Sequence, residues 1–212
     1  MHNPEVYYAI LAISFFWTIG AVLFIQFPPL AKNTIMASPE VASLFLVVFS
    51  VGVAIGSVAV NHLLKGKVSA RFAPFSVIVM AGFVVAFWFV ARIWPVPTEG
   101  PLLDVPQFLA VPMAYPLLGA LLGIAIAGGM FVVPLYAFLT TRVAPEQASR
   151  TIAANNIVNS GAMVGGALLA MALTAVGLEI TDQVLMSAGM CLVSCWLARR
   201  LVMAERAAEA ST

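Results

Sequence analysis

The sequence predicts an all-α integral membrane protein whose six transmembrane helices form a 3+3 inverted repeat. Three observations support this fold class. The 212-residue chain is 62% hydrophobic and only 9% charged, whereas soluble domains carry about a quarter charged residues. It contains six apolar runs long enough to cross a bilayer, and its two halves carry similar short motifs.

The six apolar runs define the predicted membrane domain. A spanning helix needs about 20 mostly apolar residues, because the hydrocarbon core of a bilayer is about 30 Å thick. Runs of this kind cover residues 7–30, 39–64, 72–91, 113–139, 149–176 and 180–201. Residues 92–112 contain five prolines and are predicted to be the loop between two groups of three helices. The whole chain, 1–212, is predicted to be a single membrane domain.

Basic residues predict the orientation of the helices. With six spans, one side of the membrane carries both termini and two loops, and the other side carries three loops. Eight of the ten basic residues fall on the first side, namely Lys65, Lys67, Arg71, Arg142, Arg150, Arg199, Arg200 and Arg206. Since an excess of Lys and Arg marks the cytoplasmic side, both termini are predicted to be cytoplasmic in a bacterial inner membrane protein.

Similar motifs recur in the two groups of helices. "SPEVAS" at 38–43 resembles "APEQAS" at 144–149, and "GVAIG" at 52–56 resembles "GAMVG" at 161–165. One Pro-Glu start is predicted on each side of the membrane, which is the pattern of an inverted repeat in secondary transporters. The pairs Gly52/Gly56, Gly119/Gly123 and Gly161/Gly165 have the GxxxG spacing, which predicts close helix packing.

Three asparagines form the most informative polar cluster. Asn155, Asn156 and Asn159 fall within about 100° of arc in an otherwise apolar helix. Because amides facing lipid are costly, this face is predicted to meet another helix or a wet cavity. Hydrogen bonding between packed helices is the alternative explanation, but three amides so close together favour a polar path for substrate.

Two further candidate binding residues lie beside prolines. Gln26 precedes Pro28 and Pro29, and Tyr136 follows Pro134. Proline disfavours a straight helix, and interrupted helices at corresponding positions of two repeats mark transporter binding sites. A kink at the membrane boundary is the alternative interpretation.

The predicted cytoplasmic loop "LLKGKVSARF" at 63–72 contains Lys65, Lys67 and Arg71. It resembles the Gly- and Arg/Lys-rich loop that latches the cytoplasmic gate of major facilitator transporters, so these three residues are candidates for a gate loop. The family's loop also contains an acidic residue, which has no counterpart in this segment. The polar residue nearest to its expected position is Asn61, just before the segment.

Longer stretches extend this resemblance to nearly the whole chain. "FFWTIGAVLFIQFPPLAKN", "VASLFLVVFSVGVAIGSVAVNHLLKGKVSARFAP" and "GIAIAGGMFVVPLYAFL…RTIAANNIVNSGAMVGG" resemble the lysophospholipid transporter branch of the major facilitator superfamily, in its C-terminal six helices. The resemblance implies transport of lysophospholipid, chiefly lysophosphatidylethanolamine, across the bacterial inner membrane. It also implies a second six-helix half as partner, either an N-terminal half or another copy, and an acyltransferase as a further partner.

Other function classes are disfavoured by missing motifs. The chain has no P-loop, no Ser-His-Asp arrangement and no metal-ligand cluster, so we expect no enzyme activity, no cofactor, no metal and no nucleic-acid partner. Two alternatives to lysophospholipid transport stay open at this point. One is a carrier of another amphipathic or small solute, and the other is a non-transporting membrane subunit that scaffolds an acyltransferase.

Overall fold

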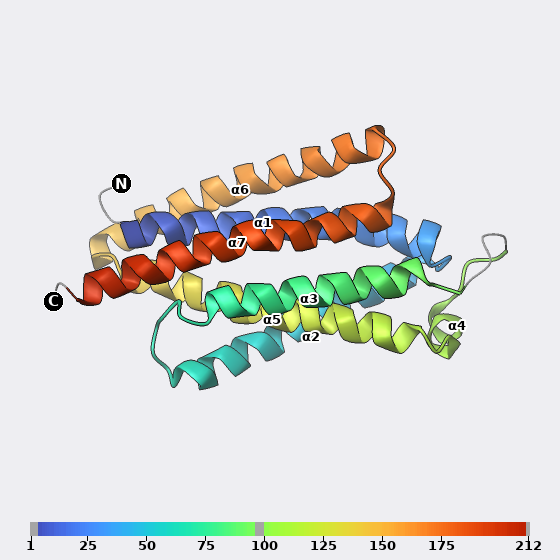
Figure 1. Ribbon diagram of the computed structural model, residues 1–212, viewed down its shortest axis with the longest axis horizontal. Helices are drawn as coiled ribbons and strands as arrows, with labels where there is room; N and C mark the ends of the chain where they lie inside the picture. Colours follow the sequence, from blue (N-terminus) through green and yellow to red (C-terminus); the bar gives the residue numbers. More distant parts are fainter. Residues whose placement is uncertain (1–3, 96–99, 211–212) are drawn as a thin grey trace.

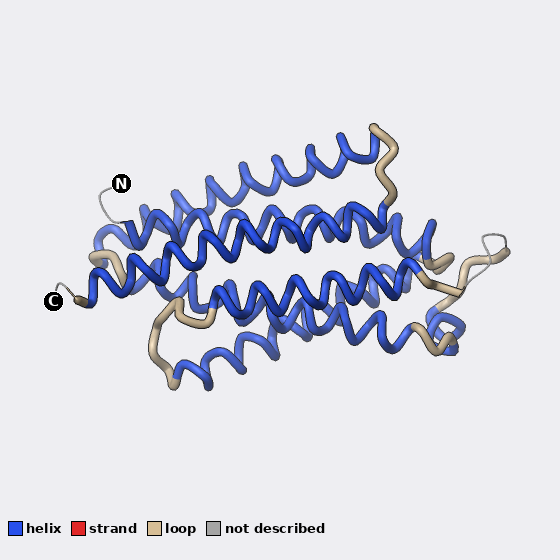
Figure 2. Tube along the Cα trace, in the orientation of Figure 1, coloured by secondary structure: helices blue, strands red, loops and turns tan. Residues whose placement is uncertain are grey.

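A computed structural model describes residues 4–95 and 100–210, and almost all of the described chain is helical (Figures 1 and 2). Six helices are long and apolar enough to cross a membrane, which confirms an all-helical chain with six candidate spans. The helices are α1 (Pro4–Pro29), α2 (Pro39–Leu64), α3 (Ala73–Arg92), the short α4 (Val105–Ala110), α5 (Ala114–Thr141), α6 (Pro145–Ala175) and α7 (Ile180–Glu209), with a π-helical turn, η1 (Leu30–Thr34), directly after α1.

The six long helices run up and down along one bundle. Figure 1 shows that α1 begins and α7 ends at the same end of the bundle, hereafter the terminal end. Helices α1, α3 and α6 run away from the terminal end, and α2, α5 and α7 run back toward it. Helix α4 lies at the opposite, distal end.

Helices α1 and α5 form the centre of the bundle. Helix α1 packs mainly against α6 and α7, and α5 packs mainly against α2 and α3. Helices α3 and α7 also pack closely against each other. The spans α1 and α5 are the most buried, whereas α2 and α6 are the least buried and flank the bundle.

Glycines allow α2 to approach α5 closely. A Cβ atom on Gly56 would overlap the carbonyl oxygen of Ile126, so the absence of a side chain lets the two backbones touch. Close helix packing was also predicted at Gly161 and Gly165, but neither residue packs closely against another helix of the described chain. No neighbouring atom lies within 4 Å of a Cβ added at either position. In α6 it is Gly166 that faces a neighbour, the backbone of Thr18 in α1.

The prolines do not break their helices in the way the sequence suggests. Helix α5 continues through Pro134, and α1 continues through Pro28 and Pro29. The irregularity instead follows the double proline, where the Ile35 N–H bonds the carbonyl of Leu30 at 3.0 Å in the π-helical turn η1. Proline lacks an N–H and clashes with the preceding turn, and a wider turn is one way in which a helix absorbs such a disturbance.

The loop at the distal end is partly helical. Asp104 caps α4, because its carboxylate accepts from Gln107 N–H at 2.8 Å and the Gln107 side chain accepts from Asp104 N–H at 3.0 Å. This cap holds Phe108 fully buried, stacked on Trp94 with ring centroids 5.6 Å apart. The segment therefore covers the distal ends of α2, α3 and α5.

Helix α7 extends further than the apolar run predicts. The run ends at 201, but the helix continues to Glu209 and carries Glu205 as a buried residue. Glu5 is likewise buried in the first turn of α1. Both glutamates thus lie near the ends of their helices and are nevertheless buried, as members of an ion cluster described below.

Candidate functional site

The three asparagines of α6 separate into two environments. Asn155 and Asn159 are buried, at 0% and 6% exposure, whereas Asn156 is exposed. Helices α1 and α6 run parallel (Figure 1). The hydroxyl of Ser14 in α1 donates to the side-chain oxygen of Asn159 at 2.6 Å, and the hydroxyl of Thr18 donates to the carbonyl of Ala162 at 3.3 Å. The buried asparagines therefore face α1, and Asn156 lies on the outer side of the bundle.

Asn159 is the centre of a polar network that joins three helices. Its side-chain oxygen accepts from the hydroxyl of Ser14 in α1 at 2.6 Å. Its side-chain N–H donates to the hydroxyl oxygen of Tyr136 in α5 at 3.0 Å, and the indole N–H of Trp17 donates to the same oxygen at 2.9 Å. The structure thus brings two predicted site residues, Asn159 and Tyr136, into direct contact.

Two hydrogen-bonding groups of this region are uncommitted within the described residues. Tyr136 uses its hydroxyl oxygen as an acceptor twice, and its own hydrogen has no acceptor there. Asn155, one helical turn before Asn159, has no hydrogen-bond partner for either its side-chain oxygen or its side-chain nitrogen. An unpaired buried amide costs about 1–3 kcal/mol, so Asn155 is the least satisfied polar residue on the α1-facing side of α6.

Gln26 belongs to a different network. Its side-chain N–H donates to the Gln183 side chain of α7 at 2.5 Å, and Gln183 in turn donates to the Thr174 hydroxyl and the Leu178 carbonyl. This network ties the distal half of α1 to α7 and to the end of α6. Gln26 is buried and paired, and it does not join the Asn159–Tyr136 network.

A largely apolar pocket lies where α1 ends and α2 begins. Phe24, Phe27 and Leu46 contribute apolar walls, and Lys32 of η1 contributes the one cation of its lining. The irregular turn after the double proline therefore places a positive charge beside an apolar surface near the distal end.

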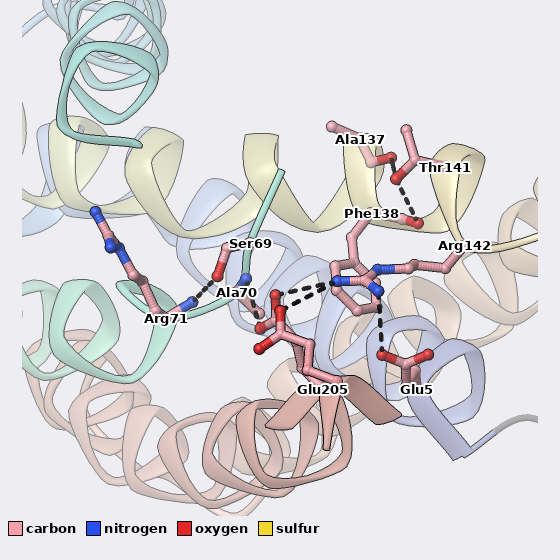
Figure 3. Close-up of polar contacts among 10 residues, drawn as sticks. Glu5, Ser69, Ala70, Arg71, Ala137, Phe138, Thr141, Arg142 and Glu205 are labelled. Carbon is pink, nitrogen blue, oxygen red and sulfur yellow. Dashed lines mark hydrogen bonds and ion pairs between the residues drawn. The ribbon is translucent and has the colours of Figure 1, made fainter. Parts of the chain in front are cut away.

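The predicted gate loop lies at the terminal end, between α2 and α3. Lys65, Lys67 and Arg71 are all exposed. The Arg71 guanidinium donates to the carbonyl of Leu63 at 3.2 Å, and Figure 3 shows it pointing away from Glu205. The loop is instead held to α7 through its backbone, because the Ala70 N–H donates to the carboxylate of Glu205 at 3.2 Å.

A partly buried ion cluster lies beside this loop (Figure 3). The guanidinium of Arg142, just after α5, lies 3.5 Å from the Glu205 carboxylate, 3.9 Å from that of Glu5 and 3.8 Å from that of Glu209. Side-chain exposure is only 4% for Glu205 and 10% for Glu5. One cation thus joins α1, the end of α5 and α7, and Glu205 extends the connection to the gate loop.

Sequence reasoning missed this ion cluster, although α7 carries a signal for it. Leu197, Ala198, Leu201 and Glu205 are all buried, and their spacing of three to four residues continues one helical face. A carboxylate on the continuation of a core face predicts a buried cationic partner. The identity of that partner, Arg142, is not readable from the pattern, because it follows a different helix.

The comparisons with known proteins give no relative for this chain. No protein-family model matches it, and neither a curated protein nor a solved structure matches it significantly.

Proposed function

We propose that the chain is one six-helix half of a major facilitator transporter and that the assembled transporter moves lysophospholipid across the bacterial inner membrane. The proposal rests on the resemblance of three long segments to the lysophospholipid branch, together with six candidate spans and a polar network inside the bundle. Both termini are proposed to be cytoplasmic, which makes the terminal end of the bundle the cytoplasmic end.

The helix contacts support a 3+3 inverted repeat. If α1, α2 and α3 correspond to α5, α6 and α7, the packing of α2 on α5 corresponds to that of α6 on α1. The packing of α3 on α5 then corresponds to that of α7 on α1, and both pairs are among the most extensive contacts of the bundle. Corresponding helices also run in opposite directions (Figure 1), as an inverted repeat requires.

The main support for the proposed headgroup-binding site is the buried side-chain amide of Asn155, which has no hydrogen-bond partner among the described residues. Asn155 can accept and donate one or more hydrogen bonds, and Tyr136 retains a hydroxyl hydrogen that suits a phosphate oxygen. Neutral hydrogen-bonding groups of this kind can hold a zwitterionic headgroup without burying an extra charge. We therefore assign headgroup contact to Asn155 and Tyr136, with Asn159 orienting Tyr136.

The pocket at the distal end suits the other part of a lysophospholipid. The molecule has a single acyl chain joined through glycerol to a phosphate group, and the pocket combines the apolar side chains of Phe24, Phe27 and Leu46 with Lys32. We propose that this pocket receives the lipid from the outer leaflet, with its phosphate near Lys32. The Asn155–Tyr136 region would then contact the headgroup later on its path.

The exposed side of α6 supports a second half as partner. Asn156 and Ser160 are exposed on α6 together with Gly161 and Gly165, and polar side chains facing lipid are unfavourable. Small residues allow another helix to approach closely. An N-terminal six-helix half or a second copy of the chain would cover this surface, and an acyltransferase that consumes the cargo is a further proposed partner.

Uptake of labelled lysophosphatidylethanolamine tests the function. The full chain is reconstituted into proteoliposomes with a candidate N-terminal half, or alone if it purifies as a dimer. Cargo accessible on each side is then measured over time. The proposal expects lysophospholipid to cross faster than in protein-free vesicles, while a diacyl phospholipid does not. Equal rates with and without the assembled protein would refute it and would favour the scaffold alternative.

A further inference from the structure

A basic groove lies at the terminal end of the bundle, where α3 begins and α7 ends. Its lining comes from the last residues before α3 and from the final turns of α7. The cationic members are Arg71, Arg199, Arg200 and Arg206, and Trp196 and Met203 are the main apolar members. This groove is separate from the Asn159–Tyr136 network and from the distal pocket.

The four arginines of the groove carry uncompensated charge. No carboxylate of residues 4–95 and 100–210 lies within ion-pair distance of any of them. The nearby carboxylate of Glu205 is already occupied by Arg142 and by the Ala70 N–H. Among the described residues, the lining of the groove therefore carries a net positive charge, while Glu205 and Glu209 line the neighbouring pocket with Arg71 and Arg206.

The apolar side chains of the groove are typical of a position at the membrane surface. Trp196 and Met203 are both 53% exposed on α7, and the guanidinium of Arg200 lies 5.4 Å from the centre of the Trp196 ring. Exposed Trp is typical of the membrane–water interface. Arginines one turn beyond such a residue lie at the depth of lipid headgroups, because a helix rises 1.5 Å per residue.

We propose that the groove binds the phosphate of an anionic diacyl phospholipid, such as phosphatidylglycerol, from the adjacent leaflet. The planar guanidinium fork matches phosphate oxygens and can bind them with two hydrogen bonds. Trp196, one turn before Arg199 and Arg200, provides the surface along which the upper part of an acyl chain lies. Basic pockets between transmembrane helices on the cytoplasmic side bind anionic headgroups in this manner. The inference does not depend on which cargo the protein transports.

Native mass spectrometry of the full chain in detergent micelles tests the proposal. The protein is titrated with dioleoyl phosphatidylglycerol and with dioleoyl phosphatidylcholine, and the dissociation constant of the first bound lipid is compared. We expect phosphatidylglycerol to bind about tenfold or more tightly, and the variant R199Q/R200Q to lose this preference, since each surface arginine contributes roughly a fivefold effect. The matched control is Arg150→Gln. Arg150 is an exposed arginine of α6 that forms no ion pair with the described residues and lies outside the groove, so this variant should bind both lipids as the wild type does.

Several results would overturn the inference. Equal affinity for the two lipids would do so, and so would an unchanged preference in R199Q/R200Q. An equal loss in the Arg150→Gln control would show general attraction to a basic surface. Displacement of the lipid by millimolar inorganic phosphate would indicate an anion site without lipid specificity. If R199Q/R200Q fails to fold, as judged by circular dichroism and gel filtration, Arg71→Gln in the loop provides the same comparison.

Discussion

The side-chain N–H of Asn159 donates a hydrogen bond to the hydroxyl oxygen of Tyr136 at 3.0 Å, joining α6 to α5 in the interior of the bundle. Trp17 of α1 donates to the same oxygen. In the proposed transporter, relative movement of the three helices that contribute these groups would open or close the substrate path. This network therefore combines a structural contact with a proposed substrate contact, and the two roles predict different effects of mutation.

Asn159→Leu should destabilise the protein. The substitution removes interhelical hydrogen bonds to Ser14 and Tyr136, each worth about 0.6–1.7 kcal/mol in a membrane protein. We expect the free energy of unfolding, measured by denaturant titration in detergent, to fall by about 1–3 kcal/mol. Asn156→Leu is the control, because Asn156 is exposed and has no such bonds; an equal loss in both variants would contradict the network.

Gly56→Ala should separate α2 from α5. The added methyl group would overlap the carbonyl oxygen of Ile126, and overpacking of this kind costs about 1–3 kcal/mol. A lower melting temperature than that of the wild type is the expected result. Gly165→Ala adds the same methyl group where no atom lies within 4 Å, so its melting temperature should be unchanged or higher in the isolated chain.

Arg142→Gln should leave the carboxylates of Glu5 and Glu205 buried without their cation. Removing one member of a buried ion pair costs about 3–5 kcal/mol, and partial exposure of Arg142, at 29%, places the expected loss at the lower end of that range. Adding Glu205→Gln should recover part of the stability, because the double variant buries one fewer carboxylate. No recovery in the double variant, or an equal loss in Arg150→Gln, would argue against the cluster.

The proposed topology predicts opposite accessibility for two introduced cysteines. Both native cysteines, Cys191 and Cys195, are buried and free, so they should give little background labelling. Ala210→Cys, after α7, should react with a membrane-impermeant maleimide only from the cytoplasmic side, and Pro101→Cys, near α4, only from the periplasmic side. Labelling of both positions from one side would exclude the three crossings proposed between them, those of α5, α6 and α7.

The sequence predicted the helices better than it predicted their partners. Apolar length alone placed six spans, and Pro39 with Glu40 marked the start of α2 correctly. Angular spacing also identified Asn155 and Asn159 as one face of α6, because the helical period is fixed. It grouped Asn156 with them, although the structure places that residue on the exposed side.

Contacts between distant helices were beyond the sequence pattern. Gln26 was grouped with the binding residues because it precedes two prolines, yet it pairs with Gln183 of α7, 157 positions away. Arg142 was counted only as a basic loop residue, because nothing in its own segment indicates three carboxylates from α1 and α7. Helix period identifies a face, but the neighbour of that face depends on how the whole bundle packs.

Lysophospholipid transport by Asn155→Leu tests the central claim most directly. Asn155 has no hydrogen-bond partner within the described residues, so its replacement should leave the melting temperature unchanged or raise it, since an unsatisfied buried amide is removed. If Asn155 contacts the headgroup, the assembled variant should be as abundant as the wild type yet move labelled lysophosphatidylethanolamine at least about tenfold more slowly, as expected for loss of a hydrogen bond worth about 1.4 kcal/mol. Asn156→Leu should transport normally. Wild-type transport by Asn155→Leu in the same proteoliposomes would contradict the account.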